Sequence, residues 1–224
     1  METIEKLGGL HKFMNYPGPI LTDSGGYQVY SLSHLRKITE TGIRFSSHHD
    51  GSSHFFTPEK VIEFQKTLGS DIWTCLDVCV QNPCSHSVAK EALKKTMHWA
   101  ERSMKRYREI VSDSGVPPLL FGIVQGSVYP DLRKESALHI SELGIHGFAI
   151  GGLSVGETKR EMHECFAQTV NHLPKDRPVY FMGLGTPEDI WEAAGLGADM
   201  FDCVWPTRNA RNGCLFTSTG RLLI

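Results

Sequence analysis

The 224-residue sequence predicts an α/β fold of the (β/α)8 TIM-barrel type, with about six of the eight strands present. Two observations support this prediction. Six short segments are almost continuously apolar and alternate with segments of helical periodicity, which is typical of parallel strands covered on both faces. Polar residues or glycines follow each apolar segment, and a site built from consecutive strand ends suits a closed barrel better than an open sheet, whose site concentrates at one switch point.

The N-terminal part contains the first strand and an insertion. An apolar strand at residues 20–23 follows a short helical segment and ends in a turn at residues 24–26. Apolar and polar side chains alternate through residues 43–56 around Asp50-Gly51, and Asp-Gly is a typical hairpin turn. We therefore expect a β-hairpin insertion near residues 43–56.

The rest of the chain alternates helices and strands. Helices should begin at Thr57 and Thr186, because threonine caps helix N-termini and the proline that follows each suits the first helical position. The expected order is a helix at 57–69, a strand at 71–79, a helix at about 88–110, a strand at 119–126, a helix ending at Gly144, a strand at 147–153, a helix around 162–170, a strand at 179–185, a helix from Thr186 with Ile190, Trp191 and Ala194 on its apolar face, and a strand at 200–204.

Composition limits the class of protein. The length fits one domain, residues 1–224, and the net charge of −2 excludes a protein that is basic overall, so a polyanion would need a local basic patch. Six scattered cysteines do not resemble a disulfide scaffold. No apolar run reaches the roughly 20 residues of a membrane helix, and the N-terminus does not resemble a signal peptide, so we expect a cytoplasmic protein without a membrane span.

Three acids stand at the ends of predicted strands: Asp23, Asp77 and Asp202. Two carboxylates can supply a nucleophile and an acid/base at an acetal-like carbon, as in enzymes that cleave glycosides. A third acid, together with the amide of Gln125, could read a ring that has both donors and acceptors, and Tyr27 offers a stacking face. The residues alone therefore predict a glycosyl-transfer barrel that acts on a base or a sugar.

Other interpretations of the last strand end stay open. Asp202 could instead cap a turn or pair with Arg208. Arg208 and Arg211 lie in a predicted loop directly after Asp202, where they could also contact a phosphate backbone.

Two further patterns suggest sites more weakly. Gly25-Gly26 and Gly151-Gly152 could cradle a phosphate, but they lack a nucleotide-binding fingerprint and also fit tight turns. The second pattern is a group of possible metal ligands: Cys75, Cys79, Cys84 and His86. Two of these cysteines lie in a predicted strand, whereas zinc sites favour closely spaced cysteines on turns, so we expect no metal site in this chain.

Seven motifs resemble, in this order, those of the tRNA-guanine transglycosylases (queuine tRNA-ribosyltransferases): LTDSGGYQ, SHHDGS, LDVC, FGIVQGS, GFAIGGLSVGE, YFMGLG and DMFDCVWPTRNARNG. The resemblance covers essentially the whole chain. It implies an enzyme that exchanges the anticodon wobble guanine of certain tRNAs for a 7-substituted deazaguanine, without ATP, through a covalent aspartyl-ribose RNA intermediate. It also implies tRNA and a deazaguanine base as partners.

The resemblance assigns a role to each candidate residue. Asp202 matches the nucleophile and Asp23 the acid/base that transfers protons to and from the exchanged bases. Cys79 and Val155 resemble the bacterial members, which use an aminomethyl-deazaguanine precursor of queuine. The remaining matches are Asp77, Gln125, Gly152 and Leu153 as purine-reading groups, Tyr27 and Met182 as the pair that sandwiches the base, and Arg208 and Arg211 as residues that face the tRNA.

The sequence also departs from the family pattern. The first two barrel strands of the family and its C-terminal zinc-binding subdomain are not found, so we expect a truncated member with an incomplete barrel at residues 1–224. We expect no cofactor in this chain, and we expect structural zinc and a homodimer in full-length members. Three alternatives are an inactive fragment, a non-catalytic tRNA-binding partner subunit and a relative that modifies another tRNA position.

Overall fold

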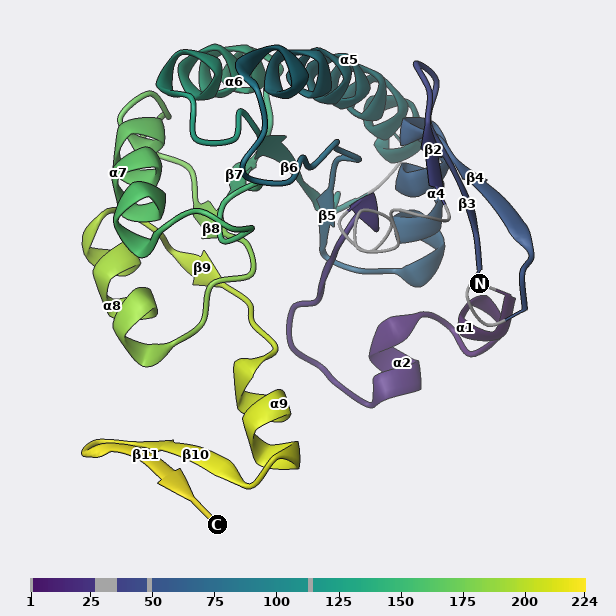
Figure 1. The fold of residues 1–224 in the computed structure, drawn as a ribbon. Helices are drawn as coiled ribbons and strands as arrows, with labels where there is room; N and C mark the ends of the chain where they lie inside the picture. The colour runs from purple at the N-terminus through teal and green to yellow at the C-terminus, as the bar shows by residue number, and fades with distance from the viewer. Residues whose placement is uncertain (1, 27–35, 48–49, 113–114) are drawn as a thin grey trace.

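The computed structural model describes residues 2–26, 36–47, 50–112 and 115–224. Its centre is a sheet of six parallel strands in the order β1-β5-β6-β7-β8-β9, curled into part of a barrel (Figure 1). The barrel-type prediction with six strands is confirmed. The strands are β1 (Leu21–Thr22), β5 (Ile72–Thr74), β6 (Leu119–Val124), β7 (Gly147–Ile150), β8 (Val179–Phe181) and β9 (Met200–Phe201).

Helices cover the convex side of the sheet (Figure 1). The predicted helix signals are confirmed, because the side chain of Thr57 accepts a hydrogen bond from the Lys60 N–H and that of Thr186 accepts one from the Asp189 N–H. Gly69 ends the first of these helices in the left-handed conformation. The helices are α4 (Pro58–Leu68), α5 (His86–Val111), α6 (Pro130–Glu142), α7 (Lys159–Val170) and α8 (Pro187–Gly195).

Both faces of the sheet are buried. On the outer face Phe166 of α7 stacks on Phe181 of β8, with ring centroids 4.5 Å apart. On the inner face Phe121, Ala149 and Tyr180 belong to one buried cluster that fills the barrel interior. Because successive strand residues point to opposite faces, strands of this kind need apolar side chains at almost every position. The near-continuous apolar segments of the sequence follow from this double burial.

The predicted hairpin insertion is part of a small antiparallel sheet. Strands β3 (Ile43–Ser46) and β4 (Ser53–Phe56) form the hairpin, and β2 (Arg36–Ile38) adds a third strand that we did not predict. This sheet lies against α5, where the indole N–H of Trp99 donates a 2.9 Å hydrogen bond to the carbonyl of Glu40.

The structure departs from the sequence predictions in four further places. The loop expected after residue 204 is a helix, α9 (Trp205–Arg211), because Pro206 occupies its first turn, where proline is tolerated, instead of breaking the chain. A hairpin of β10 (Cys214–Thr217) and β11 (Gly220–Leu223) follows and was not predicted. The predicted apolar face of helix α8 is wrong at Trp191, because the helix buries Ala193 and leaves Trp191 82% exposed. The N-terminal segment forms two short helices, α1 (Glu2–Lys6) and α2 (Leu10–Met14).

Among the described residues, no helix is both long enough and apolar enough to span a membrane.

Candidate active site

A cavity of about 250 Å³ opens at the carboxyl ends of the six barrel strands. Parallel strands place their carboxyl ends at one rim, so residues that are far apart in the sequence meet there. Tyr27 lies outside the described residues. The predicted site residues in the cavity wall are Asp23, Asp77, Gln125, Gly152, Leu153, Met182 and Asp202.

Asp202, directly after β9, is held by two donors on one carboxylate oxygen. The Tyr180 hydroxyl and the Gly183 N–H each donate a 2.7 Å hydrogen bond to Oδ1. No hydrogen bond to Oδ2 is found within residues 2–26, 36–47, 50–112 and 115–224. One oxygen is therefore anchored, and the other is available to a ligand in the cavity.

Tyr180 is a site residue that the sequence did not reveal. It lies in β8, where an aromatic side chain reads as core, and it is only 3% exposed. Burial raises the pKa of its hydroxyl, and the hydrogen bond to Asp202 and the negative charges of Asp23 and Asp202 raise it further. Tyr180 therefore keeps its proton and acts only as a donor to Asp202.

Asp202 does not pair with Arg208. Among the described residues no ion pair joins them, and the Arg208 guanidinium instead lies 5.8 Å from the ring centroid of Trp205. The alternative in which Arg208 neutralises Asp202 is therefore wrong.

Two further carboxyl groups have perturbed proton affinities. The pKa of Asp23 is raised to about 6, first because the cavity walls displace water around it and second because Asp202 adds negative charge nearby. The pKa of Asp77, which is 6% exposed, is also raised to about 6, mainly by burial, while a hydrogen bond from Gln125 opposes the shift. Groups that titrate near neutral pH in a cavity are suited to proton transfer.

Asp77 and Gln125 form a joined pair in the cavity wall. The Gln125 side-chain amide donates a 2.7 Å hydrogen bond to Asp77 Oδ2. Its Oε1 is buried and has no partner among the described residues. An unpaired buried acceptor costs about 1–3 kcal/mol, so a ligand N–H at this position would be favoured.

Gly152 lies against this amide. Its φ of +67° is in the left-handed region, and a Cβ at this position would lie 2.1 Å from Gln125 Oε1. A side chain would therefore both strain the backbone and displace Gln125. Apolar surface is added to the cavity by Leu153, Met182, Cys79 and Val155. The combination of this apolar surface with the polar pair of Asp77 and Gln125 suits a flat polar ring.

Arg208 and Arg211 do not line the cavity; they lie on α9, which begins three residues after Asp202. Figure 1 shows α9 and the β10–β11 hairpin extending from the open side of the barrel. The guanidinium groups of Arg208 and Arg221 lie 5.8 and 6.0 Å from the Trp205 ring centroid. Residues 203–224 contain these three arginines and no acidic residue, so this segment is a local basic surface.

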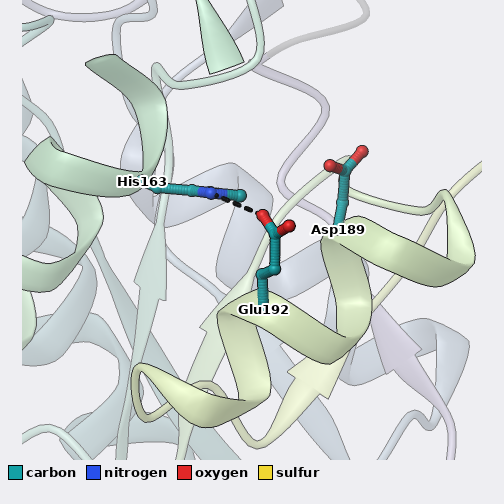
Figure 2. Close-up of side chains that lie close together, drawn as sticks. All are labelled: His163, Asp189 and Glu192. Atoms are coloured by element: carbon teal, nitrogen blue, oxygen red, sulfur yellow. Dashed lines mark ion pairs between the residues drawn. The ribbon is translucent and has the colours of Figure 1, made fainter. Parts of the chain in front are cut away.

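One group of side chains in the described part of the chain has the composition of a cation site: His163, Asp189 and Glu192 (Figure 2). It joins α7 to α8 outside the cavity, and His163 Nδ1 lies 2.9 Å from Glu192 Oε2. The Lys159 ammonium lies 2.8 Å from Asp189 Oδ1 and 3.4 Å from Glu192 Oε2. Because a resident cation already neutralises these acids, we interpret the group as an ion-pair network between two helices.

Comparisons with known proteins identify the family of this chain. The family model for queuine tRNA-ribosyltransferase matches residues 1–224. Curated relatives with that name are 54% identical over 221 residues in Caldanaerobacter subterraneus, 52% over 221 residues in Thermoanaerobacter pseudethanolicus and 51% over 223 residues in Desulforudis audaxviator. These alignments cover 99–100% of this chain and 58–59% of each relative. The chain therefore belongs to the queuine tRNA-ribosyltransferase family.

Proposed function

We propose that this chain carries the reaction centre of a tRNA-guanine transglycosylase, which exchanges the anticodon wobble guanine for a 7-deazaguanine precursor of queuine. The observation that carries the proposal is the Asp202 carboxylate, with Oδ1 fixed by two donors and Oδ2 left to the cavity that it shares with Asp23. A nucleophile held in this way loses little freedom when it attacks.

The proposed reaction has two displacements. Asp202 Oδ2 attacks the ribose C1′, the bond from C1′ to N9 of guanine breaks, and the departing base keeps that electron pair and takes a proton from Asp23. The arriving base then gives its N9 proton to Asp23 and attacks C1′, and the bond between C1′ and Asp202 breaks. Because the intermediate preserves an activated bond to C1′, the exchange needs neither ATP nor another cofactor.

The proposed substrate fits the polar groups of the cavity. The joined pair of Asp77 and Gln125 offers acceptors to the N–H groups of a guanine-like ring, and the backbone at Gly152 and Leu153 borders the same space. A base must leave its stack to enter such a cavity, and the unpaired bases of an anticodon loop lower that cost. A tRNA substrate also places the proposed activity in the cytoplasm.

A direct test is the incorporation of labelled guanine into tRNA. We expect the chain to label a tRNA that carries the wobble guanine and not one with adenine at that position. Binding of tRNA without any label would favour a non-catalytic partner subunit or an inactive fragment. Label that persists in the adenine variant would favour a relative that modifies another position.

The basic surface on α9 gives a second prediction. Arg208→Ala and Arg211→Ala should each weaken tRNA binding and lower the salt slope, because each lost phosphate contact reduces the slope by about 0.7–0.9. The measurement is tRNA affinity at several salt concentrations. Arg160→Ala is the matched control, since Arg160 is exposed on α7 and pairs with Glu164. Equal slopes in all variants would contradict a role of α9 in binding RNA.

A further inference from the structure

Helix α6 carries a buried arginine that lies behind the cavity. Arg133 is 1% exposed, and its guanidinium binds only backbone carbonyls among the described residues. Nε donates to the Ser127 carbonyl at 2.7 Å, and Nη1 donates to the carbonyls of Val124 at 3.2 Å and Gly151 at 2.9 Å. Its Nη2 is buried without a hydrogen-bond partner there. Burying a charged group without an ion-pair partner costs free energy. We therefore ask what the buried guanidinium contributes to the site.

The guanidinium stays charged despite its burial. Burial lowers the pKa of Arg133 to about 10, and interactions with nearby Cys165, Glu157 and Cys79 oppose that shift. A pKa of about 10 leaves the group protonated at neutral pH. Among the described residues its hydrogen bonds go to three carbonyl dipoles and not to a carboxylate.

The bonded carbonyls belong to peptide units that border the base site. The Val124 carbonyl shares a peptide with the Gln125 N–H, and the Gly151 carbonyl shares one with the Gly152 N–H. A single nitrogen, Nη1, thus joins the ends of β6 and β7 at the two residues that face each other in the cavity. Hydrogen bonding to a carbonyl also polarises the N–H of the same peptide, which strengthens it as a donor.

The backbone held by Arg133 is in uncommon conformations. Ser127 has φ +52° and Gly152 has φ +67°. Conformations of this kind persist when surrounding contacts define them strongly, and the Nε bond to the Ser127 carbonyl is such a contact. A second bond from α6 supports the same corner, because Ser136 Oγ accepts a 3.0 Å hydrogen bond from the Gln125 N–H.

On the basis of the proposed function, we propose that Arg133 is a positioning residue for the base. By holding the carbonyls of Val124, Ser127 and Gly151, it sets the Gln125 amide and the Gly152 N–H in the orientation that receives the ring of the exchanged base. Arg133 does not touch the base or the reacting atoms. Its loss should therefore affect base recognition more than tRNA recognition or the overall fold.

A matched control separates this role from ordinary stabilisation. Arg177 also donates a hydrogen bond to a carbonyl, that of Ile145 at 2.7 Å, but this bond lies at the opposite end of β7 from the cavity. Arg177→Met should lower the melting temperature and leave the affinity for guanine unchanged. Arg133→Lys keeps the charge of Arg133 and loses the planar fork that holds three carbonyls.

The test compares wild type, Arg133→Lys and Arg177→Met in guanine binding and in guanine exchange into tRNA. For Arg133→Lys we expect the Kd and KM for guanine to rise about 10- to 100-fold, because the groups that bind the base are no longer held in place. The KM for tRNA should stay unchanged within twofold. If Arg133→Lys does not melt cooperatively, Arg133→Gln replaces it in the same measurements, with the same expected result. An unchanged guanine Kd in the variants, or an equal rise of both KM values, would overturn the proposal.

The outcomes also separate this proposal from the proposed function. Wild-type chain that binds guanine but does not exchange it would refute the function, and the guanine Kd of Arg133→Lys would still decide the role of Arg133. Wild-type exchange with an unchanged guanine affinity in Arg133→Lys would refute only the positioning role. Wild-type chain that binds no guanine would overturn both.

Discussion

Asp202→Asn should abolish the proposed covalent tRNA adduct and lower base exchange by about 10³- to 10⁵-fold, because it removes the proposed nucleophile. Asparagine has the shape of aspartate, and its amide oxygen can still accept the hydrogen bonds from Tyr180 and the Gly183 N–H. The fold and the tRNA affinity should therefore change little. The measurement is a denaturing gel of chain and tRNA after a rapid quench, where the wild type should give a slower-migrating species.

Tyr180→Phe is the informative companion variant. It keeps the carboxylate of Asp202 and removes one of the two donors on Oδ1, so the adduct should still form, about 10- to 100-fold more slowly because the carboxylate is held less well. An adduct in Asp202→Asn that is as abundant as in the wild type would show that another group attacks. An unchanged rate in Tyr180→Phe would show that the anchoring of Oδ1 does not matter.

The strand-end residues could be predicted from the sequence for a physical reason. In a parallel sheet every carboxyl end lies at one rim, so the positions after the six apolar segments are neighbours whatever their separation in the chain. Asp23, Asp77, Gln125 and Asp202 meet in this way. A side chain that reaches the rim from within a strand, or from behind the strand, does not follow this rule.

The residues that the sequence did not reveal are of that second kind. Tyr180 lies within β8 and reads as a core aromatic, although its hydroxyl reaches Asp202. Arg133 lies on a helix, where an arginine usually indicates the solvated face, but it points inward to carbonyl groups. Pro206 was interpreted as a break, although proline also fits the first turn of a helix. In each case tertiary contacts decide between two local interpretations.

Asp23→Asn should lower base exchange by about 10²- to 10⁴-fold, since it removes the group proposed to transfer protons to and from the bases. The loss should not come from unfolding. A carboxyl whose pKa rises from 3.8 to about 6 in the folded chain binds its proton more tightly there, so stability falls as pH rises between these values. Asparagine removes that cost, and the variant should melt no lower than wild type at pH 7.5.

The pH dependence should identify Asp23 and assign its two roles. In the proposed first displacement Asp23 would give a proton to the departing guanine, so the second-order rate constant for adduct formation should fall as pH rises through about 6. This fall in rate with pH should be absent in Asp23→Asn. It should be present in Asp77→Asn, although the pKa of Asp77 is also about 6, because the loss of Asp77 is expected to weaken base binding instead. If the rate of adduct formation still falls through a pH of about 6 in Asp23→Asn, another group donates the proton.

The rate of the second displacement should show the opposite pH dependence, rising with pH, and at a lower pH than the first. In the proposed intermediate Asp202 is bonded to the ribose and has no charge, so one of the two causes that raise the pKa of Asp23 disappears and only the displacement of water by the cavity walls remains. Asp23 then ionises more readily at the step where it must accept a proton from the arriving base. We expect the rate of base capture by isolated adduct to rise with pH through an apparent pKa below that of the first step. Equal apparent pKa values for the two steps would mean that the charge of Asp202 does not control Asp23.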